Sequence, residues 1–177
     1  IPLIEYGHLD YGENKVQEAV DKWTETKLRK SDIKLHLIGK LQTNKVKFAL
    51  KIFDYIHSLD SEKLANKIAD EELKQKKKVK IFIQINLGNE DQKSGISRNK
   101  INEFYKYCKN LNLNIIGLMC IPPVEDNPDL YFKELQLLNQ KLNLQDLSMG
   151  MSSDYLKAVE NSSTYLRIGS SIFGQRD

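Results

Sequence analysis

Small hydroxyl and glycine residues gather in two turns near the end of the chain. The turns are Met149-Gly150-Met151-Ser152-Ser153-Asp154 and Gly169-Ser170-Ser171, and each follows an apolar, strand-like run. Ser152 or Ser153 is expected to cap a helix, with Asp154 in its first turn. Free backbone N–H groups at such strand-to-helix turns favour an anion. Because phosphate sites of (β/α)8 barrels often lie in the loops after strands seven and eight, the two turns together predict one phosphate cup. Taken singly, each is an ordinary capped loop.

Other residue types that carry chemistry are sparse. Cys108 and Cys120 have no metal-binding or redox spacing, so we expect no metal site and a reducing compartment, the cytoplasm. His36 and His57 lie in strand-like segments, where a core histidine and a neighbour of a ligand are equally good interpretations. The motifs GxGxxG and GxxxxGK[ST] do not occur, so dinucleotide and P-loop sites are not supported.

Length and composition indicate a globular chain. With 177 residues, 40% of them apolar, it is expected to be one domain over residues 1–177. The basic run Lys74 to Lys80 has no aromatic residues among its lysines, which predicts a solvated helix end or loop and not a nucleic-acid surface. No stretch is long and apolar enough to span a membrane. We therefore expect no nucleic-acid and no membrane partner, and a monomer.

Strand-like and helix-like segments alternate along the chain. The clearest strand alternates isoleucines with Phe82, Gln84 and Asn86. The expected strands are residues 9–11, 34–38, 55–57, 79–86, 115–120, a segment beginning at residue 147, and 164–168. This order predicts a mostly parallel sheet with helices outside it. A closed barrel needs eight strands, so we expect a (β/α)8 barrel whose first strand precedes Ile1. An open doubly wound sheet is the alternative.

Helix signals follow several of these strands. An apolar face formed by Val16, Ala19, Val20 and Trp23 predicts a helix after Asn14, which either caps that helix or directs its amide at a ligand. The other expected N-caps are Thr43, Ser61 and Ser97. The helix after Ser61 is expected to carry Leu64, Ala65, Ile68 and Leu73.

Several segments, in order over nearly the whole chain, resemble one family, the pyridoxal phosphate-binding homeostasis proteins. The resembling segments are YGENKVQE at 11–18, HLIGKLQTNK at 36–45, IHSLD at 56–60, IQIN at 83–86 with KSG at 93–95, GLM at 117–119, LSMGMS at 147–152, and RIGSSIFG at 167–174. The resemblance implies a barrel of the alanine racemase N-terminal-domain type. It also implies that the protein carries pyridoxal 5′-phosphate as a Schiff base and hands it to apo-enzymes in vitamin B6 homeostasis, without catalytic turnover.

The resemblance also implies roles for individual residues. Ser152, Gly169 and Ser170 would hold the phosphate, Arg167 would face the pyridine nitrogen, and Asn14 would line the ring or its hydroxyl. Three further residues would lie near the site: Met119, Ser148 and Met149.

One feature of the family is not found in this sequence. The Schiff-base lysine is expected upstream of Ile1; Lys40 could replace it only by pointing into the pocket, and we interpret it as a surface loop residue. Without the resemblance, the preferred interpretation of Arg167 is an ion pair with a carboxylate inside the barrel.

Two alternatives make the protein an enzyme. One is a pyridoxal phosphate-dependent amino-acid racemase or decarboxylase, which needs a second acid or base, usually from a second domain for which no room is expected after Asp177. The other is a barrel enzyme for a different phosphate ligand, with Glu13 or His57 as its base.

Overall fold

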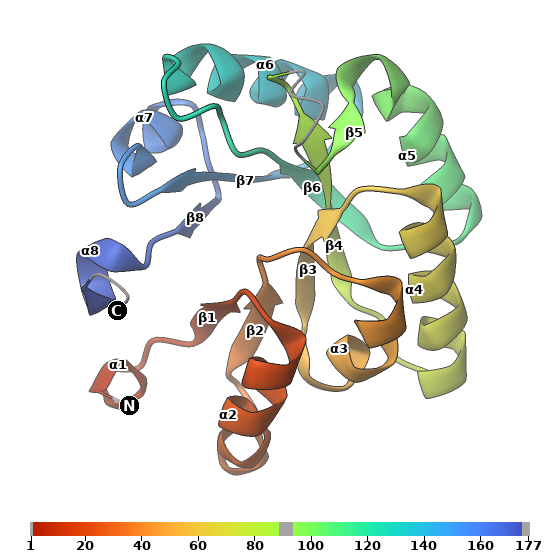
Figure 1. Cartoon of the computed structure of the whole chain (residues 1–177), viewed down its shortest axis with the longest axis vertical. Helices are drawn as coiled ribbons and strands as arrows, with labels where there is room; N and C mark the ends of the chain where they lie inside the picture. Colours follow the sequence, from red (N-terminus) through yellow and green to blue (C-terminus); the bar gives the residue numbers. More distant parts are fainter. Residues whose placement is uncertain (1, 89–93, 175–177) are drawn as a thin grey trace.

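The strands curl into one parallel sheet that forms a nearly closed barrel, as the computed structural model shows for residues 2–88 and 94–174 (Figure 1). The strands on the main path are β1 (Asp10–Glu13), β2 (Lys34–Leu37), β3 (Tyr55–Leu59), β4 (Lys80–Asn86), β6 (Ile115–Met119), β7 (Asp146–Met151) and β8 (Tyr165–Arg167). They lie side by side in chain order. A two-residue strand that the sequence did not predict, β5 (Ile96–Ser97), pairs with β4 off this path.

This strand order decides between the two expected architectures. In a doubly wound sheet the spatial order of the strands reverses direction at a switch point. In this sheet the spatial order β1-β2-β3-β4-β6-β7-β8 follows the sequence without a reversal, and every pairing is parallel. The doubly wound alternative is therefore wrong, and the count of seven main strands is confirmed. In the described part of the chain no pairing joins β1 to β8, and Figure 1 shows these two strands facing each other across the opening of the barrel.

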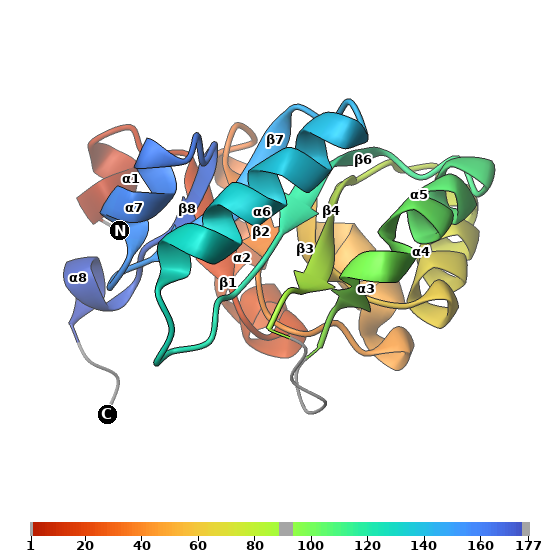
Figure 2. The same ribbon diagram turned by 90° about the horizontal axis from the view of Figure 1, so that it is seen from above.

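Helices cover the outside of the sheet (Figures 1 and 2). They are α1 (Pro2–Glu5), α2 (Val16–Arg29), α3 (Val46–Ile52), α4 (Glu62–Gln75), α5 (Ile101–Asn110), α6 (Pro128–Lys141), α7 (Tyr155–Glu160) and α8 (Ser170–Phe173), with 3-10 turns η1 (Thr43–Lys45) and η2 (Arg98–Lys100). The buried apolar side chains of the described residues form two clusters. The larger includes Ala19 and Trp23 of α2 and Leu64 of α4; the smaller consists of Tyr55, Phe82 and Met119. The larger cluster joins helices to sheet, and the smaller one fills the interior of the barrel.

Of the expected N-caps, only Ser61 makes the capping bond, in which the Leu64 N–H donates to its hydroxyl at 3.4 Å. Thr43 begins the 3-10 turn η1, and Ser97 makes no side-chain capping bond. Both predictions fail because a 3-10 turn precedes each α-helix and shifts its start. α4 carries Leu64, Ala65 and Ile68 on its buried face, whereas its Leu73 is 76% exposed.

The cap expected at Ser152 or Ser153 is also wrong, and of the two alternatives for Asn14 the capping one is wrong. Lys15 is the N-cap residue of α2, and Asp154 is the N-cap residue of α7. A turn separates the end of β7 from the start of α7, so Ser152 and Ser153 lie in that turn and not at the start of the helix. The Met151 N–H donates to the Asp154 carboxylate across that turn at 2.6 Å.

Candidate functional site

The loops after the strands meet at one mouth of the barrel, because parallel strands all present their carboxyl ends on the same side. Asn14 follows β1, Gly39 follows β2, Ser152 follows β7 and Gly169 follows β8. A Cβ on Gly39 would lie 2.2 Å from the Asn14 carbonyl oxygen, so only glycine lets the ends of β1 and β2 approach this closely. Asn14 is exposed there, and its side chain has no hydrogen-bond partner among the described residues.

Two turns form a small cup of N–H groups at this mouth. The Gly169 and Ser171 N–H groups both donate to the Ser152 hydroxyl oxygen, at 3.3 and 3.4 Å. Gly150 shapes the first turn: its φ is +93°, and a Cβ there would lie 2.5 Å from the Ala158 Cβ of α7. A Cβ on Gly169 would meet none of the described atoms within 4 Å, so the space beside the cup is open. N–H groups that converge on one oxygen suit an anion.

Arg167 is the last residue of β8, two residues before Gly169 of this cup. Its Nη1 donates to the Ser148 hydroxyl at 2.8 Å, and its Nη2 donates to the Cys120 carbonyl at 2.9 Å. None of the ion pairs found among the described residues includes Arg167, so the ion pair offered as an alternative is not present there. Burial lowers the pKa of the guanidinium from its ordinary value. Three of its five N–H donors have no partner in the described part of the chain.

Ser148 continues into a chain of hydrogen bonds inside the barrel. Its hydroxyl lies 2.7 Å from His57 Nδ1, His57 Nε2 lies 3.0 Å from His36 Nδ1, and His36 Nε2 lies 2.9 Å from the Asp10 carboxylate. Both histidines are buried. Burial is the main cause that lowers the pKa of His57 well below its ordinary value, with smaller contributions from His36 and Arg167. Burial also lowers the pKa of His36, and the adjacent Asp10 opposes that shift.

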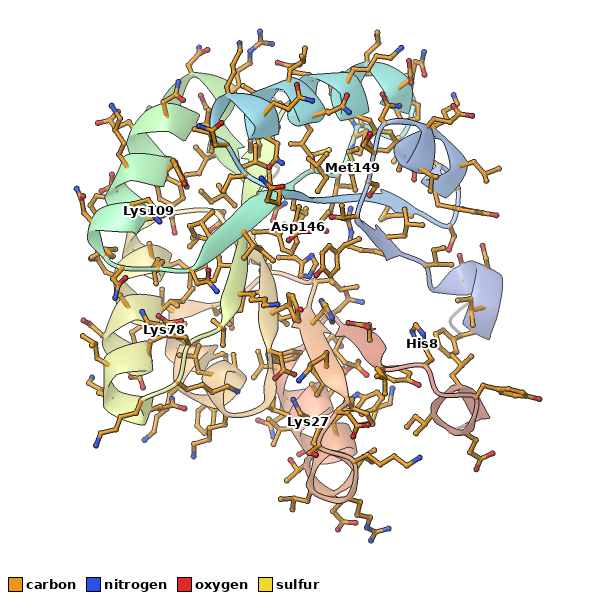
Figure 3. All side chains as sticks on the ribbon, turned by 180° about the vertical axis from the view of Figure 1, so that it is seen from behind. His8, Lys27, Lys78, Lys109, Asp146 and Met149 are labelled. Carbon is orange, nitrogen blue, oxygen red and sulfur yellow. The ribbon has the colours of Figure 1, made fainter. Side chains whose placement is uncertain are left out.

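The two methionines expected near the site lie on opposite faces of the sheet. Met119 packs in the interior cluster, but the Met149 side chain belongs to the outer cluster and lies on the α6 and α7 side of β7 (Figure 3). Met149 therefore reaches the site only through its backbone. Ser170, between Gly169 and Ser171, is exposed at the start of α8.

Two other candidates have ordinary structural surroundings. The Glu13 carboxylate accepts from Trp23 Nε1 at 2.7 Å and from Lys22 Nζ at 2.8 Å, so it anchors α2 to β1 and is not a free base. Lys40 is exposed, as expected of a surface loop residue.

The sequence analysis missed the contribution of Cys120. It acts through its backbone carbonyl, which every residue type possesses, so the sequence held no signal for it. No group of three or more potential metal ligands was found in the described ranges. Likewise, none of the helices in those ranges has the length and apolar character needed to cross a membrane.

Comparison with known proteins first defines the class. A family described as "Alanine racemase, N-terminal domain" matches residues 2–177. The barrel also resembles the alanine racemase of Clostridium difficile 630, with a TM-score of 0.75 over 99% of this chain and 47% of that one, at 12% identity. At that identity the likeness speaks for the fold alone. The chain thus has the alanine racemase type of α/β barrel.

More similar relatives narrow the class. The pyridoxal phosphate homeostasis protein of Aquifex aeolicus is 39% identical over 176 residues, which cover 94% of this chain and 76% of the relative. The structure of PipY from Synechococcus elongatus PCC7942, which has pyridoxal phosphate bound, matches with a TM-score of 0.89 at 32% identity, over 97% of this chain and 84% of PipY. The chain therefore belongs to the family of pyridoxal phosphate homeostasis proteins.

Proposed function

We propose that this protein binds pyridoxal 5′-phosphate at the mouth of the barrel and buffers it in vitamin B6 homeostasis. The observation that carries the proposal is the convergence of the Gly169 and Ser171 N–H groups on one oxygen, the Ser152 hydroxyl. A phosphate oxygen can take the place of that acceptor or join it. The names of the relatives and the cofactor bound in PipY support the same proposal.

Each site residue has a defined part in this binding. Ser152, Gly169, Ser170 and Ser171 would hold the phosphate through N–H and hydroxyl groups. The guanidinium of Arg167 has donors left over after its bonds to Ser148 and Cys120, and these would face the ring nitrogen. Because a guanidinium donates and never accepts, a nitrogen facing it keeps its lone pair and carries no proton.

Two groups complete the ring site. Asn14 would line the ring with its exposed amide, and Met119 would lie below, in the apolar interior cluster. When bound, the cofactor supplies an aldehyde that combines reversibly with amines.

We infer a carrier and not an enzyme. Ser148 and His57 are the first two side chains that follow Arg167 in the hydrogen-bond chain, and each already uses its polar atoms there. Neither is left as a free acid or base for a substrate. A racemisation assay with the cofactor-loaded protein tests this inference. Product formation that rises in proportion to protein concentration would favour the hypothesis of an amino-acid racemase over that of a carrier.

Titration with pyridoxal phosphate tests the binding itself. We expect saturable binding with one equivalent, much weaker binding of pyridoxal, which lacks the phosphate, and competition by inorganic phosphate. Arg167→Met and Ser152→Ala should each weaken binding about tenfold, the effect of losing one hydrogen bond to a charged group. A matched control is Ser162→Ala, an exposed serine in the turn after α7. Equal affinity for pyridoxal and pyridoxal phosphate would contradict the phosphate cup.

The biological setting is proposed on the same basis. We propose that the protein acts as a monomeric single domain in the cytoplasm and that apo-enzymes which use pyridoxal phosphate receive it from this carrier. Light scattering of the eluting protein measures the oligomeric state. Reactivation of an apo-enzyme by loaded protein, compared with the same amount of free cofactor, measures delivery. If the loaded protein reactivates the apo-enzyme no faster than the same amount of free cofactor does, direct delivery is contradicted.

A further inference from the structure

A hydrogen-bond chain runs through the barrel interior from Arg167 to Asp10, and the proposed binding of the cofactor does not use its far half. The chain passes through Ser148, His57 and His36, with links of 2.8, 2.7, 3.0 and 2.9 Å. It connects the mouth of the barrel with the amino-terminal end of β1, where the Asp10 side chain is 57% exposed. The chain therefore has one end at the cofactor site and the other at the solvent.

The Asp10 end sets the direction of the bonds between the side chains. The guanidinium of Arg167 only donates, so the Ser148 oxygen accepts from it and keeps a second lone pair. Because the Asp10 carboxylate only accepts, neutral imidazoles must each donate from Nε2 towards it, and the Ser148 hydrogen then goes to His57 Nδ1. A neutral His57 then carries its proton on Nε2 and donates to His36 Nδ1. His36 in turn carries its proton on Nε2 and donates to Asp10, whose carboxylate only accepts. If the bonds ran the other way, His36 Nε2 would carry no proton, and its lone pair would face the negatively charged Asp10 carboxylate at 2.9 Å.

Ring packing holds both imidazoles in the planes that these bonds need. His36 stacks on Tyr55 with ring centroids 4.1 Å apart, and His57 stacks on Phe82 at 4.4 Å. The Tyr165 ring lies next to both imidazoles, with ring centroids 5.7 Å from His36 and 5.9 Å from His57. The charged groups that act on the pair are Asp10, Asp54, Lys27 and Arg167. Burial among these rings lowers the pKa of both histidines, which favours the neutral imidazoles that these bonds need.

We propose that His57 is a positioning residue for Arg167, and that His36 and Asp10 act behind it by fixing its tautomer. Without the acceptor at His57 Nδ1, the Ser148 hydrogen loses its partner and the hydroxyl turns. The guanidinium is then held firmly only at the Cys120 carbonyl and can rotate. The part of the proposal that concerns ligand affinity rests on the proposed function; the part that concerns tautomers and the orientation of Arg167 does not.

The tautomers can be read without a ligand. The chain has three histidines and four arginines, so ¹⁵N spectra of selectively labelled protein are simple to assign. The exposed His8 serves as the reference imidazole, and Arg167→Lys identifies the Arg167 signal. We expect both His36 and His57 to carry the proton on Nε2 at neutral pH. A proton on Nδ1 of His57 would overturn the proposal.

Two variants of His57 separate positioning from packing. His57→Phe keeps a flat ring over Phe82 and removes both polar atoms, whereas His57→Asn places a side-chain oxygen near the position of Nδ1. Rotation of the Arg167 guanidinium about its Nε–Cζ bond should be at least tenfold faster in His57→Phe and close to wild type in His57→Asn. Unchanged rotation in a folded His57→Phe, or equal effects of both variants, would overturn the proposal.

Asp10 offers a second pair of variants at an exposed position, where folding is least at risk. Asp10→Ala should give a mixture of His36 tautomers, and Asp10→Asn should restore the Nε2 form because its amide oxygen accepts. A pure Nε2 form of His36 in Asp10→Ala would remove Asp10 from the proposal.

Affinity for 4′-deoxypyridoxine 5′-phosphate, an analogue without the aldehyde, links the chain to the site. His57→Phe should bind it about tenfold more weakly than wild type, and His57→Asn within about twofold of wild type. Failure of the wild-type protein to bind would contradict the proposed function, while the NMR results would still decide on the positioning role. Binding by His57→Phe as tight as wild type would overturn that role in the site.

Discussion

Acid should destabilise this fold through its two buried histidines, and replacing His57 should remove more than half of their combined effect. Burial lowers the pKa of His57 well below its ordinary value, and it lowers the pKa of His36 against the opposing effect of Asp10. In the unfolded chain both imidazoles take up a proton near pH 6.5. The unfolded state therefore binds more protons below that pH, so the stabilisation is fully present above it and is lost as the pH falls towards the folded pKa values.

The size of the loss follows from proton linkage. A histidine that stays neutral in the folded state and has an unfolded pKa of about 6.5 loses about 2 kcal/mol of stability between pH 7 and pH 5. His57 should contribute nearly this whole amount, because its ring is buried and bonded on both nitrogens. His36 should contribute less, because the Asp10 carboxylate favours its charged form.

Urea unfolding at pH 7 and pH 5 measures this prediction. The difference in unfolding free energy between the two pH values should be about 2 kcal/mol smaller in His57→Phe than in wild type. Carboxylates titrate in both proteins, so their contribution cancels in the comparison. The control is His8→Gln, which removes an exposed imidazole and should keep the wild-type difference. An equal loss in His57→Phe and wild type would refute the claim that His57 is held neutral.

Three further predictions concern other parts of the fold. Gly150→Ala should cost at least about 1–2 kcal/mol because of its left-handed φ and the approach of α7, whereas Gly169→Ala, which faces open space, should change stability by less than about 0.5 kcal/mol; thermal unfolding compares the two. Ser61→Ala should cost about 1 kcal/mol through loss of the α4 cap, and urea unfolding unchanged from wild type would contradict that cap. Because burial raises the pKa of both Cys108 and Cys120 to about 12, Ellman's reagent should label neither thiol until the protein unfolds; immediate labelling of either would show that it is accessible.

The periodicity of the sequence was sufficient to predict a parallel sheet covered by helices, whereas the choice of the barrel over the doubly wound sheet needed the strand order of the structure. Alternating strand and helix patterns indicate parallel strands. β4 was the easiest strand to recognise because both of its faces are buried, which makes its sequence rich in apolar residues. The cap residues were harder to predict because 3-10 turns, which leave little trace in composition, come before α3 and α5. β5 was missed because two residues are too few to show a period.

The candidate site was predictable to the extent that its side chains carry the chemistry. The turn composition around Ser152 and Gly169 predicted that these two residues meet, and the structure brings them within hydrogen-bond distance. The role of each as a phosphate contact stays a prediction. His36 and His57 could not be linked from the sequence, because their contact depends on the register of β2 against β3. The link from His57 to Ser148 spans 91 residues and depends on closure of the barrel interior.

Backbone amide NMR during titration with pyridoxal phosphate tests the central claim most directly. The Gly169 and Ser171 N–H groups now donate to the Ser152 hydroxyl, and binding should give them a charged phosphate acceptor. We predict that these two amide signals shift the most and that the shifts are complete at one equivalent of cofactor. Signals of α4, on the outside of the barrel, should stay in place. Saturable binding that leaves the Gly169 and Ser171 signals unchanged would contradict the site, and absence of binding would contradict the proposed function.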